Sequence, residues 1–251
     1  MRLARFLHNG VGRYGIVEGD TVTEATGEIE SGFRKGAVRY CLDEVRLLAP
    51  CTPSKIIAIG LNYRAHAAEF NKELPEEPMI FMKPPTAVIG HGDEIVYPAH
   101  MSRRVDFEGE LAVVIGREAR MVRADDAANF IFGYTCFNDV TARDLQKTDR
   151  QYARAKGFDT FAPMGPWIET DLDPLDVRIE SFLNGEKRQD TSTADMIFDT
   201  YRLVSFVSQV MTLLPGDVIA TGTPSGVGKM KPGNTVEIRI EGIGSLVNTV
   251  V

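Results

Sequence analysis

Cysteine is scarce in this sequence. The three cysteines, Cys41, Cys51 and Cys136, are an odd number and none belongs to a Cys-x-x-Cys pair. A disulfide framework or a thiolate zinc site would need paired spacing, so the sequence argues against both. Cys136 lies in the apolar run 131–137, which favours packing in the core. An enzyme that uses Cys136 or Cys51 as a nucleophile stays an alternative, which thiol alkylation would test.

Excess positive charge and long apolar runs are also missing. The sequence has 28 Lys and Arg against 35 Asp and Glu, a formal net charge of −7, which argues against a nucleic-acid partner. The longest apolar runs, such as 111–115, are far shorter than the ~20 residues of a membrane-spanning helix. The first residues also lack the apolar centre of a signal peptide. We therefore expect a cytoplasmic protein with no membrane partner.

What remains is the composition of an ordinary globular protein, with 251 residues of which 43% are hydrophobic and 25% charged. Short β-like pieces separated by glycine turns fill the first fifty residues and end at a link that contains Pro50 and Pro53. This pattern predicts a small N-terminal subdomain over residues 1–52 and a main domain over residues 53–251.

Alternating hydrophobic patterns and turn signals predict an α+β fold with much antiparallel sheet. Thr141, with Asp144 three positions on, has the spacing of a capping box that opens a helix. The dipeptide Asn184-Gly185 marks a hairpin turn. Further helices are expected at 62–71, 124–132 and near 196–214. Strands are expected at 55–60, 107–116, 134–138, 177–182 and 236–241.

The segment 106–115 carries three acids at alternate positions. On a strand, Asp106, Glu108 and Glu110 would share one face, and the apolar residues that follow predict that this face is partly buried. Buried carboxylates must be protonated or find a cation, and Asp139 at the start of another element adds a further oxygen ligand. A set of oxygen ligands suits Mg²⁺ or Mn²⁺ and does not suit zinc. The alternative is an exposed strand with scattered acids.

Arg143 and Gln146 follow Asp139 at four and seven residues, so a helix that begins at Asp139 would place all three along one stripe. Arg is suited to a bidentate grip on a carboxylate, and a nearby metal would chelate a 2-oxo acid. An ordinary amphipathic helix with a polar surface is the alternative.

His66 has a partner at helical spacing, Glu69, which could hold the imidazole as a general base toward water. A surface ion pair is the alternative for this spacing. The segment 221–230 resembles a phosphate-binding loop but has the wrong residues at its first and last positions, and Pro232 and a strand follow in place of a helix. We expect a rigid turn whose amides and Thr223 hydroxyl face a ligand.

Together these segments resemble the fumarylacetoacetate hydrolase family, in its acylpyruvase and 2-hydroxyhepta-2,4-diene-1,7-dioate isomerase branch, over residues 55–245. The resemblance implies a mixed β-roll fold, a divalent metal, action on 2-oxo or 2,4-dioxo acids, a place in the catabolism of aromatic compounds, and a homodimer. The motifs that carry it are Gly60–Tyr63 with His66 and Glu69, Met82–Pro85, Glu108–Leu111, Asn138–Gln146, Lys156–Asp159 and Thr221–Gly228.

The resemblance also implies a role for nine residues. These are the metal ligands Glu108, Glu110 and Asp139, the catalytic residues His66, Glu69 and Lys156, and the substrate-binding residues Arg143, Gln146 and Thr223.

From these roles we predict a Mg²⁺- or Mn²⁺-dependent hydrolase that cleaves a carbon–carbon bond of an acylpyruvate or fumarylpyruvate through a pyruvate enolate. In this prediction His66, held by Glu69, deprotonates the attacking water. The alternative is an isomerase, tautomerase or decarboxylase of a related 2-oxo diacid, such as a 2-hydroxyhepta-2,4-diene-1,7-dioate isomerase or an oxaloacetate tautomerase or decarboxylase. A binding protein without activity, in which the acids form a structural metal site, is a further alternative.

Overall fold

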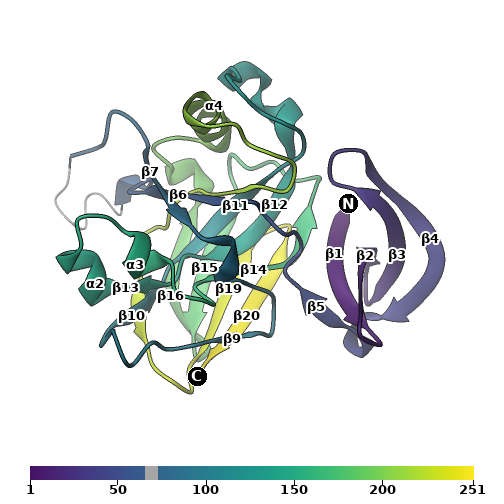
Figure 1. Ribbon diagram of the computed structural model, residues 1–251, viewed down its shortest axis with the longest axis horizontal. Coiled ribbons are helices and arrows are strands. Elements are labelled where there is room, and N and C mark those ends of the chain that lie inside the picture. The colour runs from purple at the N-terminus through teal and green to yellow at the C-terminus, as the bar shows by residue number, and fades with distance from the viewer. Residues whose placement is uncertain (66–72) are drawn as a thin grey trace.

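The computed structural model describes residues 1–65 and 73–251. The sequence-predicted pair His66 and Glu69, and most of the helix expected at 62–71, therefore lie outside the described residues. Within the described part, strands form sheets of twelve, five and three members and helices are short, so the predicted α+β fold is confirmed (Figure 1).

The twelve-stranded sheet runs through the whole molecule. Its neighbouring strands pair antiparallel, except that β17 pairs parallel to β6 and β8 parallel to β14. In spatial order its main strands are β4 (Gly32–Cys41), β3 (Thr21–Glu28), β2 (Val11–Glu18), β1 (Arg2–His8), β14 (Ala162–Glu169), β12 (Ile131–Asn138), β11 (Gly109–Ile115), β17 (Val218–Ala220), β6 (Ile56–Gly60) and β7 (Met79–Lys83). Two short strands lie off this path, β5 (Arg46–Leu48) on β1 and β8 (Val88–Ile89) on β14.

The first four strands form an antiparallel ribbon at one end of the molecule, on the right in Figure 1. β1 joins this ribbon to the rest of the sheet by pairing with β14, where Arg2 lies opposite Glu169. The N-terminal amine lies 2.8 Å from Glu169 Oε1, and Arg2 Nε lies 3.3 Å from Oε2. Because the sheet continues across this junction, the division between residues 52 and 53 stays a prediction.

Two smaller sheets support the other end. The turn of the hairpin between β15 and β16 is Asn184-Gly185, with φ values of 52° and 80°, so the predicted hairpin is confirmed. The five-stranded sheet has the order β16 (Glu186–Ser192), β15 (Arg178–Leu183), β19 (Thr235–Ile240), β20 (Gly244–Val250) and β9 (Glu94–Ile95). The three-stranded sheet has the order β13 (Thr141–Ala142), β10 (Val105–Phe107) and β18 (Gly228–Met230).

The helices are shorter than the sequence patterns predict. The helix expected at 196–214 is α4 (Thr200–Val210), whose first turn is capped by Asp199, which accepts a hydrogen bond from Arg202 N at 2.8 Å. The other described helices are α2 (Arg143–Thr148), α3 (Ala153–Lys156) and the 3₁₀ turns η1 (Leu42–Glu44), η2 (Pro85–Ala87), η3 (Ala124–Phe130) and η4 (Thr193–Asp195). The helix expected at 124–132 is the 3₁₀ helix η3, which ends at Phe130 because Ile131 begins β12.

The expected capping box at Thr141 is wrong. Thr141 lies on β13, and its hydroxyl donates to Asp139 O at 2.8 Å. The Asp144 carboxylate accepts hydrogen bonds from the Ser102 hydroxyl at 2.6 Å and from Arg103 N at 2.7 Å. Both side chains therefore have other partners, and the helix begins only at Arg143.

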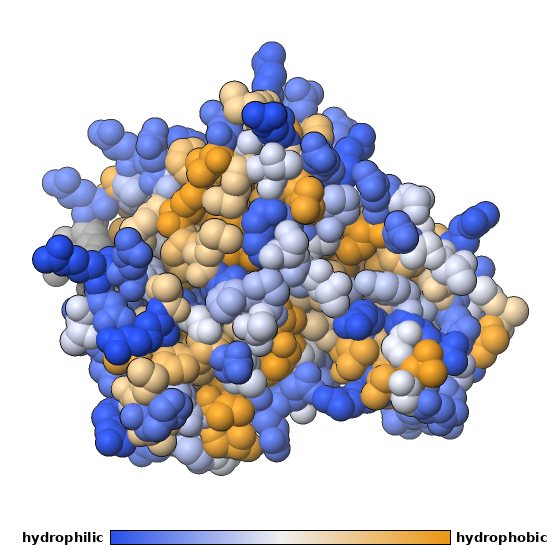
Figure 2. All heavy atoms as spheres, viewed as in Figure 1, coloured by the Kyte–Doolittle hydropathy of each residue, from blue (hydrophilic) through white to orange (hydrophobic). Residues whose placement is uncertain are grey.

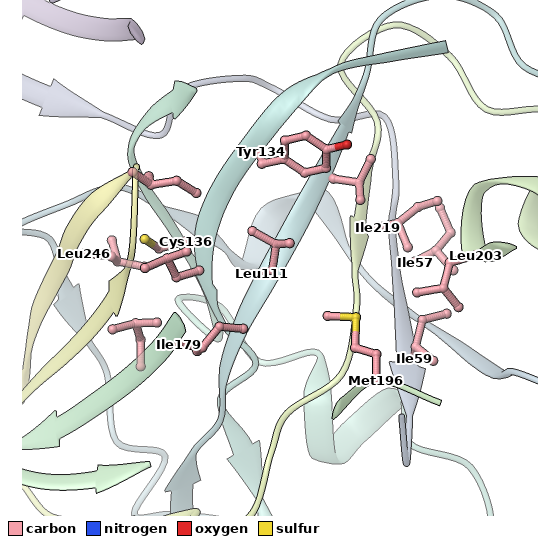
Figure 3. Close-up of a cluster of buried hydrophobic side chains, with 14 of the residues drawn as sticks. Ile57, Ile59, Leu111, Tyr134, Cys136, Ile179, Met196, Leu203, Ile219 and Leu246 are labelled. Atoms are coloured by element: carbon pink, nitrogen blue, oxygen red, sulfur yellow. The ribbon is translucent and has the colours of Figure 1, made fainter. Parts of the chain in front are cut away.

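The main core lies between the large sheet, the five-stranded sheet and α4 (Figure 3). It contains Cys136, and burial raises the pKa of its thiol to about 12, so the predicted core position is confirmed. Cys51 is also fully buried with a pKa of about 12, which makes both thiols poor nucleophiles. On the face seen in Figure 2, hydrophilic residues dominate the outline and hydrophobic ones form smaller groups between them. Among the described helices, none has the length and apolar character needed to cross a membrane.

Candidate active site

Three carboxylates meet where β11 begins and β12 ends. Glu108 immediately precedes β11, Glu110 lies on it, and Asp139 immediately follows β12. These strands pair so that Gly109 lies opposite Asn138, and Asp139 N donates to Glu108 O at 2.8 Å. One carboxylate oxygen of each acid lies within 4.8 Å of the others, and all three side chains are buried. The structure thus brings together the three acids predicted as metal ligands.

Asp106 does not join them, so the expectation that three acids share one strand face is wrong. The chain is not one continuous strand here, because β10 ends at Phe107 and β11 begins at Gly109 in another sheet. Asp106 instead accepts hydrogen bonds from Arg104 at 3.0 and 3.2 Å and from Arg143 Nε at 3.0 Å. Its role is to hold two guanidinium groups.

The expected helical stripe from Asp139 is also wrong, since β13 separates Asp139 from α2. Arg143 and Gln146 nevertheless lie on α2 beside the acids. Arg143 Nη2 donates to Glu108 Oε1, and Arg143 Nη1 donates to Gln146 Oε1 at 2.7 Å. The guanidinium is therefore held by Asp106, Glu108 and Gln146 at the edge of the acidic cluster.

Two buried lysines complete the cluster. Lys156 Nζ donates to Glu108 Oε2 at 2.7 Å and to Asp139 Oδ2 at 2.6 Å. Lys83 Nζ donates to Asp139 Oδ1 at 2.5 Å and to Val140 O at 3.2 Å. Lys156 was predicted at the site, whereas the motif Met82–Pro85 contains Lys83 without predicting a role for it. The sequence does contain a signal for Lys83. It is a lysine at the end of an apolar segment, where an unpaired charge would be costly.

The pKa values of Glu108 and Glu110 are shifted in opposite directions. Burial raises the pKa of Glu108, but Lys156 and Arg143 lower it more, to about 2. Burial, and then the charges of Asp139 and Glu108, raise the pKa of Glu110 well above its ordinary value. Glu110 Oε2 accepts a hydrogen bond from Gly222 N at 2.9 Å, and no cationic side chain of the described residues forms an ion pair with it.

The residues present fit a divalent ion. A buried carboxylate without a cationic partner, beside two other carboxylates, is the arrangement that a hard cation would relieve. The three acids supply only oxygen ligands, which favours Mg²⁺ or Mn²⁺. They leave further coordination positions for water or for the oxygen atoms of a ligand.

Thr223 lies in the turn that follows β17, as the sequence predicts, but its hydroxyl already has two partners. It donates to Gly109 O at 2.9 Å and accepts from Gln189 Nε2 at 2.8 Å. Gln189 Oε1 in turn accepts from Gly109 N at 3.0 Å, so Gln189 fixes the start of β11. Sequence reasoning missed Gln189, and its charged neighbours on β16 give no signal of burial.

The three acids line one cavity of about 370 Å³, which we call the site pocket, whereas Lys83 and Gln189 lie behind its lining. Its size lies within the ~300–1,000 Å³ typical of small-molecule sites. Lys156 Nζ lies 5.0 Å from the centre of the Phe81 ring, so one wall is apolar next to the cations. The lining residues that bear charge are Arg104, Asp106, Glu108, Glu110, Asp139, Arg143, Lys147 and Lys156. The uncharged ones include Met79, Phe81, Gln146, Tyr152, Thr223 and Val227.

Comparison with known proteins places this site in a family. Residues 55–251 match the family described as fumarylacetoacetate (FAA) hydrolase, C-terminal, and residues 1–50 match the one described as Rv2993c-like, N-terminal. The chain is 43% identical over 254 residues to oxaloacetate tautomerase YisK of Bacillus subtilis, covering 94% of this chain and 84% of that protein.

Solved structures agree with this match. The crystal structure of 5-carboxymethyl-2-hydroxymuconate delta-isomerase from Mycobacterium smegmatis is 49% identical, with a TM-score of 0.94, over 100% of this chain and 99% of that one. Maleylpyruvate hydrolase from Sphingobium sp. SYK-6, in complex with manganese (II) ion and pyruvate, is 34% identical, with a TM-score of 0.84, and the match again covers 100% of this chain and 99% of that one. The resemblance seen in the sequence motifs is confirmed, and the chain belongs to the fumarylacetoacetate hydrolase family of enzymes.

Proposed function

We propose that the protein is a Mg²⁺- or Mn²⁺-dependent enzyme that interconverts tautomers or double-bond isomers of a 2-oxo diacid, with oxaloacetate as the first substrate to test. The tautomerase and isomerase relatives are 43% and 49% identical to the chain, against 34% for the hydrolase. The alternative drawn from the sequence therefore has more support than carbon–carbon hydrolysis, which the sequence ranked first.

The observation that carries the proposal is the cluster of cations around three buried carboxylates. Tautomerisation of a 2-oxo acid develops negative charge on the 2-oxo oxygen, and preorganised cations stabilise such charge strongly. Lys156 uses two of its three N–H donors on Glu108 and Asp139, which leaves one for a ligand in the site pocket. Arg143 and Gln146, which are hydrogen-bonded to each other on α2, would orient the substrate carboxylate.

Glu108, Glu110 and Asp139 would hold the divalent ion, which supplies a Lewis-acidic site for the 2-oxo acid end of the substrate. His66 and Glu69 keep the role of the proton-transferring pair as a prediction from the sequence. Thr223 would act through the turn that it fixes, since its one O–H donates to Gly109 O and its oxygen accepts from Gln189.

The test follows the ultraviolet absorbance of enol-enriched oxaloacetate after protein is added with Mg²⁺, with Mn²⁺ or after EDTA treatment. We expect metal-dependent loss of the enol signal without release of pyruvate. Acetylpyruvate is assayed in parallel. Decay of acetylpyruvate to pyruvate with oxaloacetate unaffected would contradict the proposal and favour hydrolysis. Metal binding without turnover of either compound would favour the inactive binding protein.

Hydrolysis of a 2,4-dioxo acid is the second candidate, since maleylpyruvate hydrolase, a relative over the full chain, has been crystallised with manganese (II) ion and pyruvate. It requires an activated water, so His66→Ala should abolish it while oxalate binding persists. The homodimer implied by the resemblance also stays a prediction, which light scattering of the purified protein would test.

A further inference from the structure

Lys147 differs from every other cation that lines the site pocket. The others are each bound to an acid of the same pocket: Arg104 to Asp106, Arg143 to Asp106 and Glu108, and Lys156 to Glu108 and Asp139. Lys147 is exposed and forms no ion pair with any acid in the part of the chain that the structure describes. Its ammonium group is therefore available to a ligand.

The charge of the pocket favours a ligand with two negative groups. Among the described residues, its lining has four acidic and four basic side chains, whose formal charges sum to zero. A divalent ion would add two positive charges, and the buried Lys83 behind Asp139 adds one more. The carboxylate next to the 2-oxo group neutralises only one of these charges. A second carboxylate would thus enter a pocket that still carries a positive charge.

The position of Lys147 on α2 shows which end of a ligand it would meet. Arg143 and Gln146 lie three residues apart on this helix and bind each other at the edge of the acidic cluster. Lys147 lies four residues after Arg143, on the same face of the helix, and also lines the pocket, but it is exposed whereas Arg143 and Gln146 are partly buried. Met79, Phe81 and Val227, which also line the pocket, are uncharged and do not compete with Lys147 for an anionic group.

We propose that Lys147 is a specificity-determining residue that binds the distal carboxylate of a dicarboxylate ligand. This inference rests on the proposed function of the site, because it assumes that the 2-oxo acid end binds at the three buried acids. Arg104 differs from Lys147 because its charge is already paired with Asp106, to which Nε and Nη2 donate. A lysine on a flexible four-carbon stem suits this task, because it can reach diacids of different length.

The test measures binding and not turnover, so that it can succeed or fail independently of the tautomerase assay. Mg²⁺-loaded protein is titrated calorimetrically with racemic malate, racemic 2-hydroxybutyrate and oxalate. Malate and 2-hydroxybutyrate share the metal-chelating end and differ in a distal carboxylate against a methyl group. Oxalate reports on the metal site alone. The variants are Lys147→Met, Lys147→Arg and the control Arg150→Met, an exposed cation three residues on that lines a neighbouring cavity.

We expect the wild type to bind malate more tightly than 2-hydroxybutyrate. Lys147→Met should lower the affinity for malate by about fivefold while the affinities for 2-hydroxybutyrate and oxalate change by less than about twofold. Lys147→Arg should keep the preference, and Arg150→Met should leave all three affinities unchanged. Equal binding of malate and 2-hydroxybutyrate by the wild type would overturn the inference. So would an equal loss for all three ligands in Lys147→Met, or the same loss in Arg150→Met.

Discussion

Lys83 shows how much one side chain contributes to the charge balance of the site. Its ammonium group has no solvent exposure and donates to Asp139 and to Val140 O. Burial lowers the pKa of Lys83, while Asp139 raises it. The lysine is therefore stable in its charged form only because the acids surround it, and the acids in turn depend on it in the absence of a metal ion.

We predict that Lys83→Met destabilises the metal-free protein by about 3–5 kcal/mol, because a buried charge cluster loses one partner. The remaining acids should bind a divalent ion more tightly, so Mn²⁺ should raise the urea midpoint of this variant more than that of the wild type. Urea unfolding in EDTA and in Mn²⁺ measures both effects. Lys35→Met, which removes an exposed pair with Glu18, is the control and should cost less than about 1 kcal/mol. Equal stability of Lys83→Met and wild type in EDTA would contradict the prediction.

His91 provides a pH dependence away from the acids of the site. Burial lowers the pKa of His91, and its Nδ1 accepts a hydrogen bond from Val247 N at 3.2 Å. Because the folded protein favours the neutral imidazole, this contribution to stability is complete above the pKa of the unfolded chain and is lost as the pH falls through the lower pKa of the folded one. His91→Asn keeps an acceptor but does not titrate.

We therefore expect His91→Asn to reduce the fall in melting temperature between pH 7 and pH 5 by a few degrees. Differential scanning calorimetry at several pH values measures this difference. His8→Asn, which changes a histidine of the N-terminal ribbon, is the comparison. Parallel pH profiles for wild type and His91→Asn would refute the role of His91.

At the scale of elements, the sequence predicted which acids come together better than it predicted the strands that carry them. Alternation in 106–110 predicted that Glu108 and Glu110 lie together, and in the structure both lie where β11 starts, next to Asp139. The same alternation wrongly included Asp106, since a periodic pattern does not reveal that the chain passes from one sheet to another at Glu108. Lys83 and Gln189 were missed for a related reason, as their partners Asp139 and Gly109 are distant in the sequence.

Asn62 connects three elements beside the site. Its amide donates to Phe198 O at 2.9 Å and to Thr221 O at 2.7 Å, and its carbonyl accepts from Phe198 N at 2.9 Å. It thus ties the end of β6 to the segment before α4 and to the turn after β17. In that turn Gly222 has a φ of 97°, and a Cβ there would lie 2.8 Å from the Cβ of Asn62, so only glycine fits.

We predict that Asn62→Ala destabilises the protein by roughly 3 kcal/mol, because it leaves buried backbone groups without partners. It should also weaken metal binding, since the turn donates Gly222 N to Glu110. Chemical denaturation and calorimetric titration with Mn²⁺ measure the two effects. Asn234→Ala, in an exposed turn where the side chain accepts from Lys231 N, should cost less than about 1 kcal/mol and leave metal binding intact. Unchanged Mn²⁺ affinity in Asn62→Ala would show that the turn is held by other contacts.

At the scale of the molecule, the site depends on the assembly of all three sheets. Glu108 and Glu110 flank the start of β11 in the large sheet, Arg143 follows β13 of the three-stranded sheet, and Gln189 comes from the five-stranded sheet. The site for a divalent ion is therefore assembled only when the chain is folded, so the ion would bind the folded state and not the unfolded one. Such binding stabilises the whole protein by mass action.

We predict that Mg²⁺ or Mn²⁺ at about 100 times its dissociation constant stabilises the fold by ~2.7 kcal/mol, which corresponds to a rise of several degrees in melting temperature. Oxalate should add a further rise only when the metal is present, because it would bind through the ion. Glu110→Gln, which keeps the shape of the side chain but not its charge, should lose most of both effects. Thermal unfolding with and without EDTA measures them. A rise with metal but none with added oxalate would identify the three acids as a structural site, and a rise with oxalate in EDTA would show that the anion binds the lysines and Arg143 without a metal.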